Sequence, residues 1–80
     1  MTESRRKELK DIADELFHLN VSLEQLRDEE EEFFENIPED LHGSEVYERA
    51  EEVVEALTEA CSSLDDVVEM IEGAIEDVLS

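Results

Sequence analysis

The spacing of apolar residues most constrains this chain, because they recur three and four positions apart on both sides of its single proline. Before the proline they are Leu9, Ile12, Leu16, Leu19, Leu23, Leu26 and Phe33, and Glu30 fills the one missing step. This heptad pattern predicts a long helix with those residues as its seam. Pro38 disfavours helical geometry at Ile37 and cannot donate to a helical ladder, so we expect the helix to end near Asn36.

A second heptad pattern follows Gly43 and predicts a second helix of similar length. Ser44 is a favourable N-cap, and Glu45 and Glu48 suit the positive end of the helix dipole. The expected seam comprises Val53, Leu57, Ala60, Leu64, Val67, Ile71, Ala74 and Val78, and a flanking row comprises Tyr47, Val54, Cys61, Val68 and Ile75. Three apolar positions in each heptad are more than contact with one helix requires.

The predicted fold is all-α, a coiled-coil-like antiparallel two-helix hairpin that occupies residues 1–80 as one domain. We expect the first helix over about 3–36, the turn over 37–43 and the second helix over about 44–79, each roughly 50 Å long. In a monomer the flanking row would be exposed, as would an outward pair, Phe17 and Val21. We therefore expect a homodimer that forms a four-helix bundle; the alternative is that the flanking row docks onto a target protein.

Charge is the second unusual feature, because 26 acidic and 6 basic side chains give a formal net charge of −20. The acid is spread along both predicted helices at one carboxylate per roughly 4 Å, compared with one phosphate per ~3.4 Å on each DNA strand. Two helices of roughly 10–12 Å side by side also approximate the width of a duplex. The sequence thus predicts a set of protein-binding carboxylates: Asp28, Glu29, Glu30, Glu31, Glu32, Glu35, Glu48, Glu51, Glu52, Glu55, Glu59, Asp65, Asp66, Glu69, Glu72 and Glu76. A solvated acidic surface without a partner is the alternative interpretation.

No pattern favours a catalytic, metal or cofactor site, and we expect a non-enzymatic protein with no cofactor. Glu15 with His18, and Glu39 with His42, match the Glu-x-x-His spacing of di-iron bundles, but the first pair lies off the seam and His42 lies in the turn. Cys61 has no partner at ligand spacing and is expected to be buried as a small apolar residue. The sequence shows no membrane-length apolar run and no signal-peptide core, which predicts a cytoplasmic protein that contacts neither membrane nor nucleic acid directly.

Two stretches carry a resemblance to known proteins: RRKELKDIADEL at residues 5–16 and LEQLRDEEEEFFENIPEDLHGSE at residues 23–45. With the Glu-rich heptads that follow, the chain resembles a group of short helical proteins encoded by phages and prophages of gut bacteria, a group without an established function. In charge and size it is also similar to the phage-encoded DNA mimics that block restriction enzymes, CRISPR effectors, repair glycosylases or nucleoid proteins. That second likeness is one of physical properties, without a shared motif.

Two functions are compatible with these features. The first is an inhibitor of phage or mobile-element origin, in the cytoplasm of a host bacterial cell, which blocks the nucleic-acid-binding surface of a basic host protein by charge mimicry. The second is a structural or adaptor coiled-coil module that joins a larger assembly through its apolar row and Phe17 with Val21. Reversing acidic charges would abolish binding in the first case, and polar substitution of Val54, Val68 and Ile75 would abolish it in the second.

Overall fold

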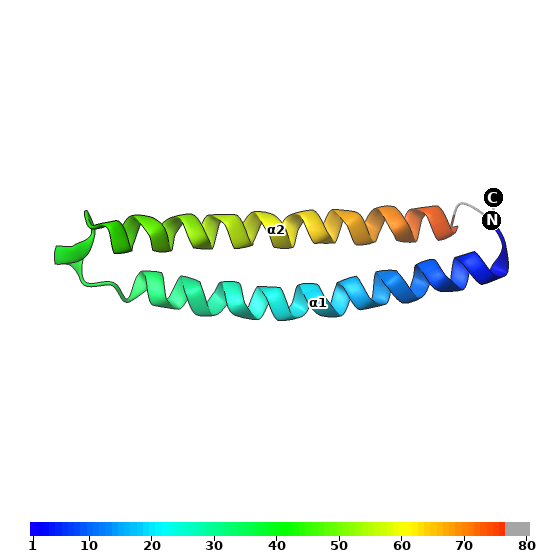
Figure 1. Cartoon of the computed structure of the whole chain (residues 1–80), viewed down its shortest axis with the longest axis horizontal. Coiled ribbons are helices and arrows are strands. Elements are labelled where there is room, and N and C mark those ends of the chain that lie inside the picture. The colour runs from blue at the N-terminus through cyan, green and yellow to red at the C-terminus, as the bar shows by residue number, and fades with distance from the viewer. Residues whose placement is uncertain (77–80) are drawn as a thin grey trace.

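The computed structural model, which describes residues 1–76, is an antiparallel hairpin of two long helices (Figure 1). Helix α1 spans Glu3–Glu35, a single 3-10 turn η1 spans Glu39–Leu41, and α2 spans Glu45–Glu76. The hairpin measures 59 × 17 × 14 Å. The predicted all-α helical hairpin is confirmed. The first helix is expected to end at about residue 36, and α1 ends one residue earlier, at Glu35. The expected continuation of α2 to about residue 79 lies outside the described residues.

The ends of the helices are fixed by short polar side chains. The Thr2 hydroxyl accepts a hydrogen bond from the backbone N–H of Arg5 at 3.2 Å, which caps α1. The Ser44 hydroxyl donates to the carbonyl of Leu41 at 2.6 Å and accepts from the backbone N–H of Tyr47 at 3.4 Å. Ser44 therefore caps α2 as predicted, and its second hydrogen bond ties the cap to the turn.

The seam of α1 differs from the predicted one in four of its seven positions. The buried or half-buried side chains that follow the heptad are Leu9, Ala13, Leu16, Asn20, Leu23, Arg27 and Phe34. The prediction is wrong for Ile12, Leu19, Leu26 and Phe33, which are all about half exposed. The row of Leu9, Leu16 and Leu23 is common to both patterns. Of the two rows beside it, the structure uses the one with small side chains at Ala13 and Asn20, which lets the middle of the two helices lie close together.

The seam of α2 is displaced in the same sense. It consists of Tyr47, Ala50, Val54, Leu57, Cys61, Leu64, Val68, Ile71 and Ile75. The row predicted as flanking, from Tyr47 to Ile75, is therefore part of the seam, and the row of Val53, Ala60, Val67 and Ala74 lies beside it; Val78 lies outside the described residues. Cys61 is buried as predicted.

Asn20 fixes how the two helices are aligned. Its side chain is 3% exposed, and its amide nitrogen donates to the Asp65 carboxylate at 2.8 Å and to the Cys61 carbonyl at 3.3 Å. A buried Asn in a helical seam favours the one register in which its hydrogen bonds form. The Asn20 side-chain oxygen is buried without a hydrogen-bond partner, so the contact specifies alignment at some expense of stability.

The turn is closed by stacked rings. The Phe34 ring packs against the Tyr47 ring with centroids 4.8 Å apart, and the His42 ring also packs against Tyr47, with centroids 4.4 Å apart. The His42 Nε2 atom lies 3.1 Å from the carbonyl oxygen of Ile37, and the Ile37 residue is buried. These contacts hold the loop against the ends of both helices.

The core of the hairpin is thin. Among residues 1–76, the apolar side chains that count as buried are Ala13, Ile37, Ala50 and Cys61. None of the large side chains described is fully buried. Two helices alone therefore leave most of their larger apolar residues partly in contact with water.

Candidate interaction surfaces

The seam divides the hairpin into two broad sides that differ in chemistry. In α1 and α2 alike, one row of residues borders the seam on each side, and residues seven apart share a face because seven residues make nearly two turns. A groove near the turn is lined by Phe33 of α1 together with Val46 and Val53 of α2, so these rows share one side. Near the chain ends, Lys10 of α1 and Glu72 of α2 line a groove on the opposite side.

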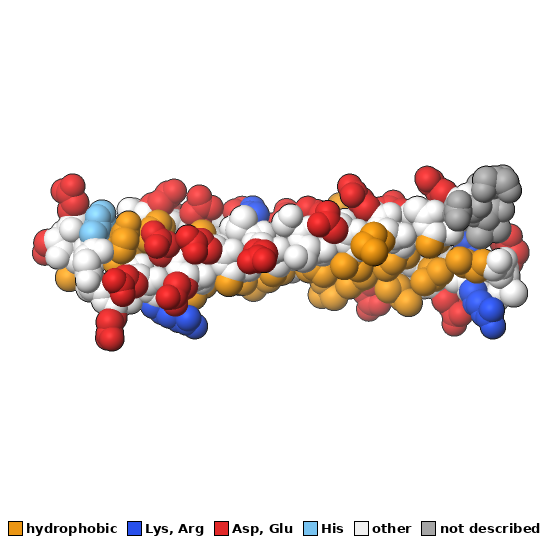
Figure 2. All heavy atoms as spheres, turned by 90° about the horizontal axis from the view of Figure 1, so that it is seen from above, with side chains coloured by type: hydrophobic (Ala, Val, Ile, Leu, Met, Phe, Trp, Pro, Cys, Tyr) orange, Lys and Arg blue, Asp and Glu red, His pale blue; other side chains and the backbone are white. Residues whose placement is uncertain are grey.

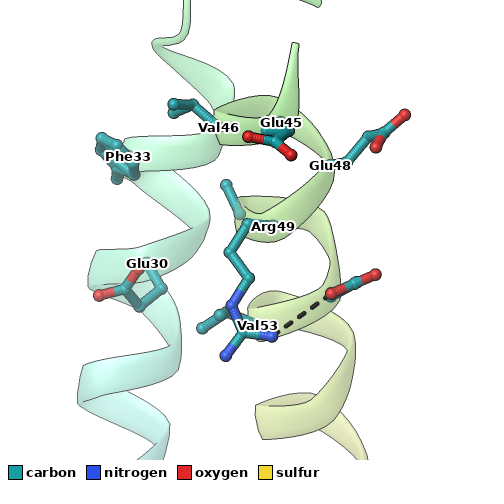
Figure 3. A pocket seen from close by; sticks show the side chains of 9 residues that line it. Glu30, Phe33, Glu45, Val46, Glu48, Arg49 and Val53 are labelled. Carbon is teal, nitrogen blue, oxygen red and sulfur yellow. Dashed lines mark hydrogen bonds and ion pairs between the residues drawn. The ribbon is translucent and has the colours of Figure 1, made fainter. Parts of the chain in front are cut away.

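The first side is the apolar face, defined by Ile12, Leu19, Leu26 and Phe33 of α1 and by Val46, Val53, Ala60, Val67 and Ala74 of α2. Figure 2 shows hydrophobic side chains as a band along the lower edge of the molecule, most continuous over the half near the chain ends. The groove at its turn end has a volume of about 580 Å³. In Figure 3, Phe33 and Val46 lie on the same side of the two helices, and Arg49 lies along the groove, paired with Glu52 at 3.3 Å.

The second side is the acidic face, which carries thirteen carboxylates among the described residues: Glu3, Asp14, Glu24, Asp28, Glu31 and Glu35 of α1 and Glu48, Glu51, Glu55, Asp65, Glu69, Glu72 and Glu76 of α2. All of them are exposed except Glu24, which is half-buried. Acidic side chains accordingly line the upper edge of the view in Figure 2. Phe17 interrupts the row on α1 and is 55% exposed.

Carboxylates are densest at the turn end of the acidic face. The α1 members from Glu24 to Glu35 and the α2 members from Glu48 to Glu55 give seven carboxylates along about 16 Å of helix, roughly one per 2.4 Å. Duplex DNA carries one charge per ~1.7 Å of its axis. This part of the hairpin therefore comes within a factor of two of the charge density of a duplex.

Few cations neutralise this acid. Within residues 1–76 the ion pairs are Arg6 with Glu3, Lys10 with Asp14, Arg27 with Asp28, and Arg49 with Glu52. Each joins residues of a single helix, so no cation in this set bridges the two helices. The hydrogen bond to Asp28, at 3.0 Å from the Arg27 guanidinium, is the main reason that the pKa of Arg27 is raised.

All sixteen carboxylates predicted as protein-binding residues are exposed, but the structure distributes them over three regions. Ten lie on the acidic face: Asp28, Glu31, Glu35, Glu48, Glu51, Glu55, Asp65, Glu69, Glu72 and Glu76. Four lie along the outer edges of the helices: Glu32, Glu52, Glu59 and Asp66. Glu29 and Glu30 lie toward the apolar face. The prediction omitted Glu3, Asp14 and Glu24, which belong to the acidic face by their places in the heptad.

Neither the remaining features of the described chain nor comparison with known proteins adds a site to these surfaces. Residues 1–76 hold no group of three or more His, Cys, Asp or Glu side chains placed to bind a metal ion. Neither helix, over its described length, is long and apolar enough to cross a membrane. No family model, curated protein or solved structure matches the chain.

The two Glu-x-x-His patterns are separated by the fold. His18 is exposed and lies edge-on to Phe17, with ring centroids 5.9 Å apart. His42 belongs to the ring cluster at the turn, where it stacks on Tyr47. Neither histidine points into the seam, which is where helical bundles hold their metal ligands.

Proposed function

We propose that this chain is a non-enzymatic DNA mimic of phage or mobile-element origin, which occupies the nucleic-acid-binding surface of a basic host protein such as a defence nuclease or a CRISPR effector. The observation that carries the proposal is the acidic face, where rows of carboxylates from two helices run side by side. A groove lined by Lys and Arg gains charge pairing and releases its own counterions when it meets such a surface, as it does with phosphates.

The turn end of the acidic face is the part best suited to this role. Glu31 of α1 and Glu51 of α2 flank the seam at the same level, and neither has an ion-pair partner within residues 1–76. Like charges on neighbouring helices repel one another and weaken the hairpin. A basic partner would relieve that repulsion, which adds to the free energy of binding.

Two charge-reversal variants test the proposal. The first replaces four carboxylates of the acidic face at the turn end with Lys: Glu31, Glu35, Glu48 and Glu51. The second replaces four exposed carboxylates outside the acidic face with Lys, which gives the same net charge: Glu8, Glu15, Glu59 and Asp66. Each variant and the parent chain are immobilised and exposed to bacterial lysate, and bound proteins are eluted with a duplex oligonucleotide.

The parent chain and the second variant should retain the same basic proteins, the duplex should displace them, and the first variant should lose them. Binding should weaken as salt rises, because the contact is electrostatic. Equal retention by both variants, or bound proteins that duplex DNA cannot displace, would show that the chain does not act as a nucleic-acid mimic.

The exposed apolar face favours a second candidate, a structural or adaptor coiled-coil module that joins a larger assembly. Val54, Val68 and Ile75 belong to the seam, so polar residues there would unfold the hairpin and cannot test this function. Leu19→Ser with Val67→Ser is the appropriate variant, because both side chains are exposed on the apolar face. An adaptor would lose its partner in this variant, whereas a DNA mimic would keep it. We likewise propose a homodimeric four-helix bundle, in which the apolar face lies between the two copies.

A further inference from the structure

The apolar face carries little acid in a chain where almost a third of the residues are acidic. Its nine residues include no carboxylate, and neither do Arg49, Ala56, Ser63 and Met70, which form the adjoining outer row of α2 within the described residues. Acid borders the face on the α1 side, in the outer row of Glu8, Glu15 and Glu29, and Glu30 lines the groove at its turn end. Met70 is 72% exposed, the highest fraction among the large apolar residues described. Water alone gives no reason to keep carboxylates away from these thirteen surface positions, whereas burial against another surface does.

The size of this face fits a stable protein interface. From Val46 to Ala74 it runs for roughly 42 Å, and with the 17 Å width of the hairpin it covers roughly 700 Å². A standard interface buries roughly 800 Å² on each partner. The chain exposes 6130 Å² in total, whereas a compact monomer of 9.2 kDa exposes roughly 4,900 Å². The surplus is enough to supply one such interface.

A second copy of this chain fits the face better than a basic protein does. Lysine and arginine side chains are attracted to the acidic face, and over most of the apolar face they would lose their hydration without meeting a carboxylate. A second copy presents the same apolar band, so two bands can be buried with charge confined to the groove at the turn end, where Glu30 and Arg49 lie. With both apolar faces inside, both acidic faces remain on the outside of the resulting four-helix bundle.

Side-chain sizes indicate how the two copies are oriented. Across the apolar face, each large residue of α1 lies level with a smaller residue of α2, for example Leu19 with Ala60 and Ile12 with Val67. If the turns of both copies lie at the same end, α1 of one copy covers α2 of the other, and large side chains meet small ones at every level. If the turns lie at opposite ends, Leu19 meets Leu19 and Ala60 meets Ala60, which leaves one seam crowded and the other hollow.

Charge at the turn end agrees with the first orientation. Arg49 borders the apolar face on α2, is largely exposed, and has only Glu52 of its own helix as ion-pair partner among residues 1–76. At the same level on α1 lie Glu29 and Glu30, which carry no ion pair in the described chain. With the turns together, Arg49 of each copy faces these two carboxylates of the other copy.

From these features we infer that the apolar face is the contact surface between two copies of this chain, packed face to face with their turns at the same end. The inference is independent of what the acidic face binds, because the residues that carry it lie on the other side of the hairpin.

The first test is the mass in solution by light scattering, which should be twice 9.2 kDa at micromolar concentration. Leu19→Glu should raise the dissociation constant of the dimer about 100-fold or more, because the dimer would bury two such charges. Phe17→Glu is the matched control, since Phe17 and Leu19 are 55% and 59% exposed and lie on opposite sides of α1. The control should remain dimeric. A monomeric parent chain, or equal effects of the two variants, would overturn the inference.

The second test uses disulfide formation and does not depend on how Leu19→Glu folds. In a Cys61→Ala background, chains with Leu19→Cys are mixed with chains that carry Ala60→Cys and are then oxidised. The mixture should give the mixed dimer, and Leu19→Cys alone should give little product, because only the turns-together orientation places Leu19 over Ala60 of the other copy. Efficient coupling of Leu19→Cys to itself, or no coupling in the mixture, would refute the orientation and with it the inference.

Discussion

Replacing Asn20 by Leu should stabilise the hairpin, although Asn20 is buried and makes two hydrogen bonds across the seam. Leu has the same branched shape as Asn, so the substitution fits the space without a cavity. It removes a buried oxygen that has no partner and adds apolar surface to the core. It also removes the hydrogen bond to Asp65, but Asp65 is exposed and its carboxylate can bind water instead.

The magnitude follows from four changes. Relieving the partnerless oxygen contributes about 1–3 kcal/mol, and burying the leucine side chain contributes about 1.5–3 kcal/mol. Loss of the hydrogen bond to the charged Asp65 costs about 1.5–3 kcal/mol, and loss of the one to the Cys61 carbonyl costs about 0.5–1.5 kcal/mol. The midpoints of these ranges give a net stabilisation of about 1 kcal/mol. For a chain of this length each kcal/mol shifts the melting temperature by roughly 4–8 °C, so Asn20→Leu should raise it by about that amount.

Thermal unfolding followed by far-UV circular dichroism measures this effect. Asn20→Asp is the matched control: it has nearly the same shape but places a second carboxylate beside Asp65 in a buried position, so it should melt well below the parent chain. If Asn20→Leu melted at or below the temperature of the parent chain, the Asn20 oxygen would have to be hydrogen-bonded in solution. Asn20 would then fix the register of the helices without lowering the stability of the hairpin.

Three further outcomes are expected. Phe34→Ala should destabilise the hairpin by about 2–3 kcal/mol in urea, because it empties the ring cluster around Tyr47, whereas Phe33→Ala, measured where the chain is monomeric, should change stability by less than about 0.5 kcal/mol. Ser44→Ala should cost about 1 kcal/mol in the same assay through loss of the α2 cap, and an unchanged midpoint would contradict that role. Salt should affect the two surfaces in opposite directions: between about 0.1 and 1 M, where the screening length falls from roughly 10 to 3 Å, self-association should strengthen and binding to a basic partner should weaken. Sedimentation equilibrium and a binding titration measure this last pair, and a common direction would mean that one surface has been assigned wrongly.

Much of this fold could be predicted from single residues and their spacing. Pro38 locates the end of α1 to within one residue, and Ser44 locates the start of α2, because both act through local backbone geometry. The burial of Cys61 also follows from its type and position. These features depend on interactions within a few residues, which a sequence displays directly.

The phase of each helix about its own axis could not be predicted in the same way. Helix α2 carries three adjacent apolar rows, and any two neighbouring rows have heptad spacing, so the pattern alone permits more than one seam. In α1 the row of Leu9, Leu16 and Leu23 has an apolar row on one side and the mixed row of Ala13, Asn20, Arg27 and Phe34 on the other. The choice depends on contacts between residues distant in sequence, above all between Asn20 and Asp65, 45 positions apart. The row of Ala13, Asn20, Arg27 and Phe34 is less apolar than the row of Ile12, Leu19, Leu26 and Phe33, so hydrophobicity favours the row that the structure leaves exposed.

The ambiguity in helix phase also explains why the predicted carboxylates are all exposed but do not share one face. Their exposure follows from their charge, which makes burial without a partner costly. Their division between the acidic face, the outer edges and the border of the apolar face depends on the phase of the helices, and the scarcity of acid on the apolar face becomes visible only when the seam is known. Glu24 was missed because it stands apart from the dense run at Asp28–Glu32, although it faces the same way as Glu31.

The elongated shape of the hairpin has a consequence for how its size is measured. Its radius of gyration is 18.0 Å, whereas a globular chain of 80 residues has roughly 12 Å, and a globular chain with this radius has roughly 250 residues. A slender particle also meets more friction than a sphere of equal mass. On a gel-filtration column calibrated with globular standards, even a lone chain would therefore elute earlier than a globular protein of 9.2 kDa.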